Sequence, residues 1–248
     1  SAMGPADVAG ATRLVDICVD AGVNLVDTAN VYSAGLSEEI LGQAMRGKRD
    51  RLIVATKARN VSGDGPNDGG ASRHHIMREC EKSLARLQTD CIDLYQMHNW
   101  DGITPQEETL RALTDLQQAG KIRYFGVSNY AGWQLMKSLM TSAVSGLPKI
   151  VSQQIYYSLE NRDAENEMIP VAIDQGLGVL IWSPLAGGLL SGKYRRDAAG
   201  PDGARHVVGW PEPPNPDMDR IHRIVDGLTE IAGRHGCLVP QAALAYLL

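Results

Sequence analysis

The sequence contains few cysteines, and none of them is spaced for metal binding or for a disulfide framework. Four of the 248 residues are Cys, with no C-x-x-C pair among them: Cys18, Cys80, Cys91 and Cys237. Zinc sites and disulfide scaffolds need paired or closely spaced cysteines. We therefore expect buried, reduced thiols, no bound metal, and a cytoplasmic protein, because a free Cys packs as a small hydrophobe.

Long apolar runs and clusters of basic residues are also missing. No apolar run approaches the roughly 18 residues of a transmembrane helix. The formal net charge is −5, and Lys and Arg are scattered singly along the chain. A protein that binds nucleic acid or an anionic membrane needs a basic surface. We therefore expect neither as a partner, while the oligomeric state leaves no sign in the sequence.

Nucleotide-binding motifs are absent or incomplete. No apolar run is followed by G-x-G-x-x-G, the glycine fingerprint of a Rossmann sheet. The stretch "GGLLSGKY" fits the G-x-x-x-x-G-K part of a P-loop from Gly187 to Lys193, but Tyr194 replaces the Ser or Thr that binds magnesium. We therefore do not expect a nucleoside triphosphatase, although the backbone amides and the Lys can still meet a phosphate.

The sequence does contain a regular alternation of apolar and amphipathic segments. Six short apolar runs are typical of strands: 23–29, 51–57, 90–98, 122–129, 150–157 and 178–185. Strands that alternate with helices at a spacing of about 30 residues predict βαβ units and a parallel sheet. An open doubly wound sheet and a closed (β/α) barrel both fit this alternation. The missing glycine fingerprint favours the barrel, and a chain that is 44% hydrophobic can form it as one domain.

Several helices between these runs have readable ends. Thr104 can cap a helix that has Pro105 at its first position and ends at Gly120. Ser37 and Ser72 precede two further amphipathic segments, and we expect both to act as caps.

Polar side chains follow the apolar runs, at the ends where a barrel carries its functional residues. The first three runs are associated with Asp27 and Tyr32, with Lys57, and with His98. The later runs carry Ser128, Asn129, Gln153, Trp182 and Ser183. Each has an ordinary alternative: Asp27 as a turn cap, Lys57 as a solvated strand end, His98 as a core histidine. Their joint appearance at corresponding places favours a functional site.

These residue types together suit the reduction of a carbonyl group. Hydride transfer leaves negative charge on oxygen, which must be protonated as it develops. A tyrosine, with an ordinary pKa of about 10, can act as the acid if a neighbouring ammonium favours its phenolate. Lys57 suits that role, Asp27 would keep the Lys57 ammonium charged, and His98 would orient the carbonyl or share the proton relay.

The same residues resemble a known family. The stretches "VDTANVYSAGLSEEILGQAM", "IVATK", "DLYQMHNWD", "GVSNY", "SQQIYYSLENR" and "WSPLAGGLLSGKY" resemble the aldo-keto reductases over essentially the whole chain. The family's tetrad maps onto Asp27, Tyr32, Lys57 and His98. The last two stretches are most similar to the branch that includes bacterial general reductases and potassium-channel β subunits.

The resemblance implies an α/β fold, the (β/α)8 TIM barrel, which binds NADPH in an extended form. The nicotinamide carboxamide would be held by Ser128, Asn129 and Gln153. Trp182 would stack under the nicotinamide ring, and the alternative is that it is a core aromatic. Asp27 belongs to both the catalytic set and the cofactor-binding set. The pyrophosphate would lie along Ser183, Pro184, Leu185, Gly187 and Lys193.

The ends of the chain depart from the family pattern. A closed barrel of this family needs eight strands. The sequence contains six of them, and the family's first and last strands are missing. A sheet of six strands would leave two edges exposed and prone to aggregation. We therefore expect residues 1–248 to form a single barrel domain within a longer polypeptide, with 1–4 as a tag remnant. An intact mass equal to 26.8 kDa would contradict this expectation. The family's motif for the adenosine 2′-phosphate follows the missing last strand, so the preference for NADPH over NADH rests on the resemblance alone.

Two functions follow from these observations. The first is an NADPH-dependent reductase of small aldehydes or ketones, with Tyr32 as the general acid. The second is an NADP(H)-binding redox-sensing or regulatory subunit with little turnover, as in channel β subunits. Trp100, Tyr130 and the loop in the 60s are candidate substrate walls, and they predict an aromatic-tolerant pocket.

Overall fold

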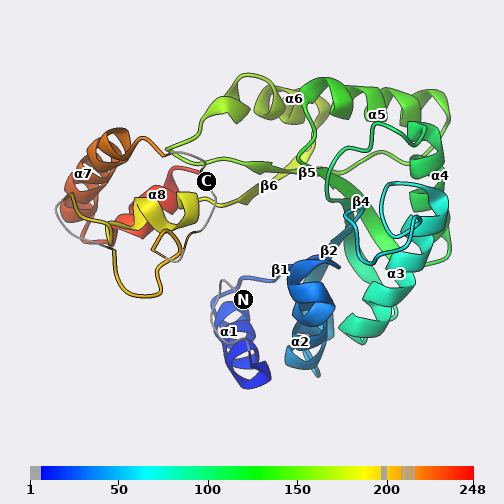
Figure 1. Cartoon of the computed structure of the whole chain (residues 1–248), viewed down its shortest axis with the longest axis horizontal. Helices are drawn as coiled ribbons and strands as arrows, with labels where there is room; N and C mark the ends of the chain where they lie inside the picture. Colours follow the sequence, from blue (N-terminus) through cyan, green and yellow to red (C-terminus); the bar gives the residue numbers. More distant parts are fainter. Residues whose placement is uncertain (1–6, 197–199, 208, 210–212, 214–215) are drawn as a thin grey trace. The chain divides into compact units, whose positions relative to one another are not determined.

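The computed structural model describes residues 7–196, 200–207, 209, 213 and 216–248 (Figure 1). The expected tag remnant at 1–4 lies outside these residues. The described chain falls into two compact units. The first runs to Gln153 and includes Val171–Gly178, and the second comprises Gln154–Pro170 and Val179–Leu248. A single domain over 1–248 stays a prediction.

All six predicted strands are present. Their bounds are β1 Leu25–Asp27, β2 Ile53–Ala58, β3 Ile92–Met97, β4 Ile122–Ser128, β5 Ser152–Tyr156 and β6 Gly178–Trp182. The sheet has the sequential order β1-β2-β3-β4-β5-β6, and the pairs from β1 to β4 are parallel. A doubly wound sheet would reverse its strand order at a switch point, whereas the wall of a (β/α) barrel does not. The strand order therefore confirms the barrel-type fold over the doubly wound alternative.

Helices follow the strands in alternation. The α-helices are α1 Val8–Asp20, α2 Leu36–Ala44, α3 Arg73–Leu87, α4 Gln106–Gln118, α5 Gly132–Val144, α6 Met168–Gln175, α7 Met218–His235 and α8 Val239–Ala245. Short 3-10 turns are η1 Tyr32–Gly35, η2 Arg49–Arg51, η3 Asp163–Glu165 and η4 Ala186–Ser191.

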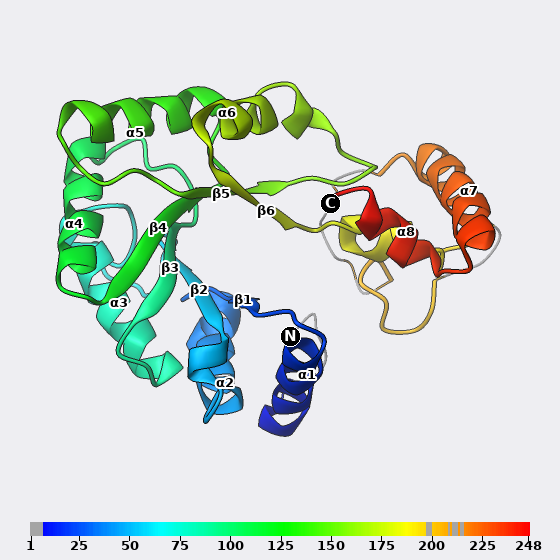
Figure 2. The ribbon, with the colours of Figure 1, turned by 180° about the vertical axis from the view of Figure 1, so that it is seen from behind.

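The core of the first unit lies between the sheet and helices α1 to α5. These helices pack one against the next, and α2 to α5 cover the same face of the sheet in both views (Figure 2). The interface between the two layers buries Ile76, Leu87, Ile92, Tyr95 and Leu113 almost completely. Burial of an aliphatic side chain of this size contributes about 1.5–3 kcal/mol each to folding. This layer fixes the strands, and with them the residues at their C-terminal ends.

One of the three predicted helix caps is confirmed. The hydroxyl of Ser72 accepts a hydrogen bond from the backbone N–H of His75 at the start of α3. Thr104 does not cap α4, because its hydroxyl donates to Asp101 instead and the helix begins one residue after Pro105. Ser37 lies inside α2, where its hydroxyl contacts that of Thr28. Thr104 thus bonds a side chain three residues before it, and Ser37 contacts one nine residues before it, in place of a capping contact.

The second unit has a smaller core of its own. Helices α7 and α8 pack against η4, and this contact buries Leu189, Leu190, Ile221, Leu228 and Ala243. Asp217 caps α7 by accepting from the N–H of Arg220, and Gly236 ends it in the left-handed conformation. The core therefore supports the loop that carries the predicted phosphate-binding residues.

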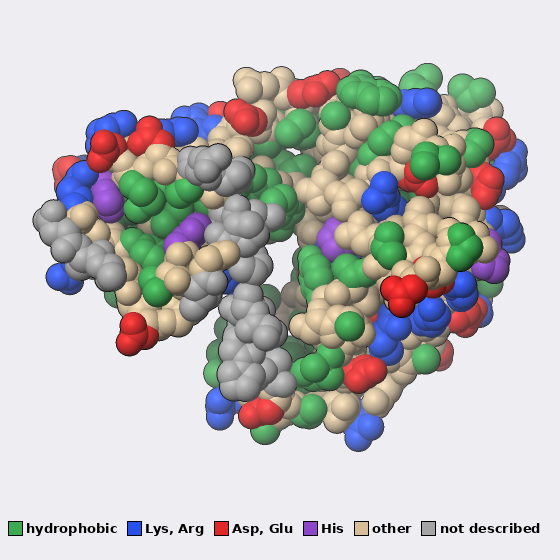
Figure 3. Space-filling view, viewed as in Figure 1, with side chains coloured by type: hydrophobic (Ala, Val, Ile, Leu, Met, Phe, Trp, Pro, Cys, Tyr) green, Lys and Arg blue, Asp and Glu red, His purple; other side chains and the backbone are tan. Residues whose placement is uncertain are grey.

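Charges of both signs are interspersed on the helical side of the first unit. Figure 3 shows Lys and Arg side chains beside Asp and Glu side chains there. Several form ion pairs, including Arg73 with Asp115 and Lys121 with Glu81. Within the described part of the chain, no helix combines the length and the apolar character needed to cross a membrane.

Candidate active site

The centre of the site is an ion pair between two neighbouring strands. Asp27 is the last residue of β1, and Lys57 lies near the end of β2. The Nζ atom of Lys57 lies 2.5 Å from Oδ2 of Asp27, and it also donates to the backbone oxygen of Thr28 at 3.0 Å. The Lys57 side chain is fully buried, whereas the Asp27 side chain is 28% exposed. A buried ammonium is thus held beside a carboxylate that water can still reach.

Burial and charge act on Lys57 in opposite directions. Burial lowers the pKa of Lys57, because the charged form loses its hydration. The charge and the hydrogen bond of Asp27 raise it, and the net result is a pKa below the ordinary value for lysine. The ammonium therefore depends on the carboxylate beside it.

Tyr32 lies directly above this pair, at the start of η1. Nζ of Lys57 is 5.1 Å from the centroid of the Tyr32 ring, a distance typical of a cation–π contact. The tyrosine is 42% exposed. Ser33 and Ala34 follow in left-handed conformations, which turn the chain sharply after the tyrosine. The turn presents the phenol at the surface while its ring stays against the buried ammonium.

His98 follows β3 and completes the cluster. Its ring meets the Tyr32 ring edge-on, with 5.6 Å between centroids. Burial, with the charges of Lys57 and Arg59, lowers the pKa of His98 to about 4. The imidazole is therefore neutral at physiological pH, and it carries one N–H. Its Nδ1 atom finds no hydrogen-bond partner within the described part of the chain.

Three of the predicted cofactor residues lie in the same unit. Ser128 is the buried last residue of β4, and Asn129 follows it in a left-handed conformation. The Asn129 amide donates to the backbone oxygen of His98 and to the Ser128 hydroxyl, at 3.1 Å each. Gln153 is buried in β5. Asn129 therefore links the end of β4 to His98, the residue that follows β3.

One residue of this cluster, Gln96, was not predicted from the sequence. Its amide Nε2 donates to Oδ1 of Asp27 at 3.2 Å, so the two oxygens of Asp27 have different partners. Gln96 is fully buried and pairs with Lys57 in the register of β2 and β3. A signal was present in the sequence, because residues two apart in a strand share a face and Gln96 precedes His98 by two.

The second unit contains the other predicted cofactor residues. Trp182 ends β6, and its ring stacks on that of Tyr156, with 4.6 Å between centroids and 19° between planes. This stack forms a flat aromatic surface at the end of the strand. Trp182 is partly buried, and its place at the nicotinamide ring stays a prediction.

The loop after Trp182 is built from tight turns. Ser183, Gly187 and Gly188 have positive φ angles of 54°, 64° and 99°. The Ser183 hydroxyl accepts from the Gly187 backbone N–H at 3.3 Å. A Cβ atom on Gly188 would lie 3.0 Å from Nζ of Lys193, so the glycine leaves room for the lysine. Successive left-handed turns with an adjacent cation are typical of anion-binding loops.

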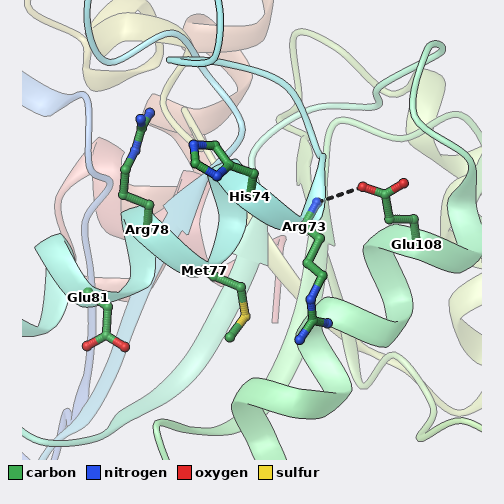
Figure 4. A pocket seen from close by; sticks show the side chains of 6 residues that line it. All are labelled: Arg73, His74, Met77, Arg78, Glu81 and Glu108. Atoms are coloured by element: carbon green, nitrogen blue, oxygen red, sulfur yellow. Dashed lines mark hydrogen bonds between the residues drawn. The ribbon is translucent and has the colours of Figure 1, made fainter.

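A surface hollow in the first unit is a different feature. It has a volume of about 680 Å³ and lies on the outer side of the unit, over α3 and α4. Figure 4 shows its lining residues, Arg73, His74, Met77, Arg78, Glu81 and Glu108, and none belongs to the tetrad. Its Arg side chains are paired, Arg73 with Asp115 and Arg78 with Asp68. We interpret it as a solvated groove between helices.

No group of three or more His, Cys, Asp and Glu side chains in the part of the chain that the structure describes is arranged to hold an ion.

Comparison with known proteins agrees with this geometry. Residues 2–248 match the aldo/keto reductase family. The chain is 39% identical to an uncharacterized oxidoreductase, YrpG, of Bacillus subtilis (strain 168), over 96% of this chain and 74% of that protein. It is 37% identical to a probable voltage-gated potassium channel subunit beta of Oryza sativa subsp. japonica, over 97% and 74%. It is 32% identical to versiconal hemiacetal acetate reductase of Aspergillus parasiticus, over 95% and 74%.

These relatives are of the two kinds that the sequence resemblance indicated, oxidoreductases and channel β subunits. The chain belongs to the aldo/keto reductase family, whose fold is the (β/α)8 barrel predicted from the sequence.

Proposed function

We propose that this protein reduces small aldehydes or ketones to alcohols with NADPH, and that Tyr32 donates the proton. The observation that carries the proposal is the buried Lys57 ammonium, paired with Asp27 and lying 5.1 Å from the ring centroid of a half-exposed tyrosine. A structural ion pair would not need a phenol presented to solvent above it. An acid that must give up a proton to a substrate does need that exposure.

Each member of the tetrad has a distinct task in this proposal. The Tyr32 hydroxyl gives its proton to the carbonyl oxygen as negative charge develops there. The Lys57 ammonium stabilises the phenolate that remains, and Asp27 keeps that ammonium charged. Neutral His98 donates its one N–H to the carbonyl oxygen and thereby orients the substrate. A neutral imidazole is a much weaker acid than an imidazolium, so His98 does not compete with Tyr32 to protonate the carbonyl oxygen.

The residues present fit a nicotinamide dinucleotide. We assign Ser128, Asn129 and Gln153 to the carboxamide, with Asp27 close to the reacting end. We assign Trp182 to the nicotinamide ring and a set in the loop after it to the pyrophosphate: Ser183, Pro184, Leu185, Gly187 and Lys193. The tight turns of this loop, with Lys193 beside Gly188, support the second assignment. When bound, the cofactor supplies the hydride that reduces the carbonyl carbon.

A second function is supported only by the names of two relatives. A rice protein and an Arabidopsis thaliana protein, 37% and 35% identical to this chain, are named as probable potassium channel β subunits. The chain would then bind NADP(H) as a regulatory subunit with little turnover. The two functions differ in rate, since both retain a cofactor site. We further propose a cytoplasmic location and no bound metal or nucleic acid.

The proposed function is tested by the loss of NADPH absorbance with an activated aromatic aldehyde. We expect turnover by the unmodified protein and none by Tyr32→Phe, which keeps the ring and loses the proton donor. Both forms should bind NADPH equally well in a fluorescence titration. Binding without turnover in either form would support the regulatory subunit. Equal turnover by the two forms would remove Tyr32 from the mechanism.

A further inference from the structure

A buried carboxylate, that of Glu79, lies on the helical side of the sheet. Glu79 is fully buried on α3, and its side chain bonds Asn30 and Lys82. Its Oε2 atom accepts from the side-chain amide of Asn30 at 2.8 Å, and its Oε1 atom accepts from Nζ of Lys82 at 2.9 Å. A fully buried carboxylate is rare unless it is paired, and the mechanism proposed above does not use this one.

Glu79 is charged despite its burial. Burial raises the pKa of Glu79, but hydrogen bonds from Asn30, Lys82 and Ser62 lower it, and the net pKa lies below the ordinary value. Lys82 is 45% exposed, so its ammonium remains partly hydrated. Asn30 is the buried partner, with only 3% of its surface exposed. The hydrogen bond between Glu79 and Asn30 is thus charge-assisted and shielded from water, which makes it strong.

Asn30 belongs to the turn that carries the proposed acid. Its backbone N–H donates to the backbone oxygen of Lys57 at 3.1 Å, and Tyr32 follows two residues later. The backbone N–H of Tyr32 donates in turn to the oxygen of Ala29. Glu79 accounts for the one side-chain hydrogen bond found for Asn30 in the described residues, since the Oδ1 atom of Asn30 is buried and without a partner there. The Asn30 side chain is therefore held from one direction, by α3.

We propose that Glu79 and Asn30 form a brace that positions Tyr32 over Lys57. Glu79 fixes the Asn30 side chain against α3, and the backbone of Asn30 fixes the start of the tyrosine turn against β2. Both are positioning residues, because they act on the reaction through Tyr32. This inference rests on the proposed function only for its kinetic consequence. The structural claim, that the two residues order the 30–32 turn, does not depend on the proposed function.

The kinetic test compares Asn30→Ala, Glu79→Ala and Glu79→Gln below their unfolding temperatures. We expect the two Ala variants to lose 10-fold or more in kcat for an activated aromatic aldehyde, while the NADPH dissociation constant changes less than 2-fold. Glu79→Gln should keep at least a third of the kcat, because its amide oxygen still accepts from Asn30 and Lys82 can turn to solvent. Glu81→Ala on the same helix, exposed and paired with Lys121, is the matched control and should be unchanged.

Other outcomes would overturn the brace. An Asn30→Ala protein that keeps more than half of the kcat excludes it, even if Glu79→Ala fails to fold. A loss of kcat accompanied by an equal loss of NADPH affinity would indicate general disruption instead of positioning.

Hydrogen exchange separates this inference from the proposed function. The amides of Asn30 and Tyr32 are hydrogen-bonded, and we expect their exchange to become 10-fold faster or more in Asn30→Ala than in the unmodified protein and in Tyr32→Phe. If the unmodified protein shows no turnover but exchange changes in this way, the proposed function fails and the brace stands. Unchanged exchange overturns the brace whatever the activity.

Discussion

The Nζ atom of Lys57 lies 2.5 Å from Oδ2 of Asp27, yet the first side chain is fully buried and the second is 28% exposed. The pair is therefore asymmetric. The carboxylate keeps some water and a second donor, Gln96, whereas the ammonium depends on the carboxylate and one backbone oxygen. Removal of Asp27 and removal of Lys57 should therefore lower the free energy of unfolding by different amounts.

We expect Asp27→Asn to destabilise the protein more than Lys57→Met. Loss of Asp27 leaves a buried ammonium without a counter-charge, which costs about 3–5 kcal/mol of unfolding free energy. Loss of Lys57 leaves a partly hydrated carboxylate and removes a buried charge, so its cost should stay below about 2 kcal/mol. Urea unfolding at pH 7 measures both. Equal losses, or a larger loss for Lys57→Met, would contradict the asymmetry.

His98 should make stability depend on pH. Its pKa is about 4 in the folded protein and about 6.5 in an unfolded chain, so the unfolded state binds more protons between these values. The neutral imidazole therefore contributes stability above pH 6.5 that is lost as pH falls towards 4. Between pH 7 and 4.5 the unmodified protein should lose about 2 kcal/mol more than His98→Gln.

Urea unfolding of both forms at the two pH values gives this difference, and the carboxylates common to both cancel. Parallel losses in the two proteins would mean that His98 titrates near its ordinary pKa.

The hydrogen bond from Gln96 to Asp27 should matter for turnover. Gln96→Met keeps the length of the side chain and removes the donor, so Oδ1 of Asp27 loses its fixed partner. We expect kcat to fall about 10-fold or more, as for the loss of one hydrogen bond to a charged group, with the fold intact. Gln96→Glu should be worse, because an ionised carboxylate beside Asp27 would repel it and would compete with it for the Lys57 ammonium. A kcat unchanged in Gln96→Met would show that Lys57 alone orients Asp27.

Two helical glycines should respond oppositely to alanine. A Cβ atom on Gly42 of α2 would lie 2.6 Å from the backbone oxygen of Arg86, because α2 and the end of α3 are in close contact there. A Cβ atom on Gly227 of α7 would meet nothing within 4 Å. Gly42→Ala should destabilise by about 2 kcal/mol or more. Gly227→Ala should stabilise by up to about 1 kcal/mol.

Thermal unfolding of the two variants checks this pair of predictions. A stabilising Gly42→Ala would mean that α2 and α3 separate easily.

Much of this protein is determined by local sequence. The six strands were readable because each is a short apolar run bounded by turn residues. The alternation with helices fitted two architectures, and the missing glycine fingerprint favoured the barrel, whose sequential strand order the structure has. The residue types of the tetrad were readable because each comes at or just after the C-terminal end of its strand. Asp27, Lys57 and His98 therefore converge without any information beyond the strand pattern and the parallel register.

Only the tertiary structure decided which groups hold these residues in place. Gln96 reaches Asp27 across 69 residues of sequence, and Glu79 reaches Asn30 across 49. Local patterns specify which face a side chain points to. The partner it meets there depends on strand register and helix packing, which no short stretch of sequence contains.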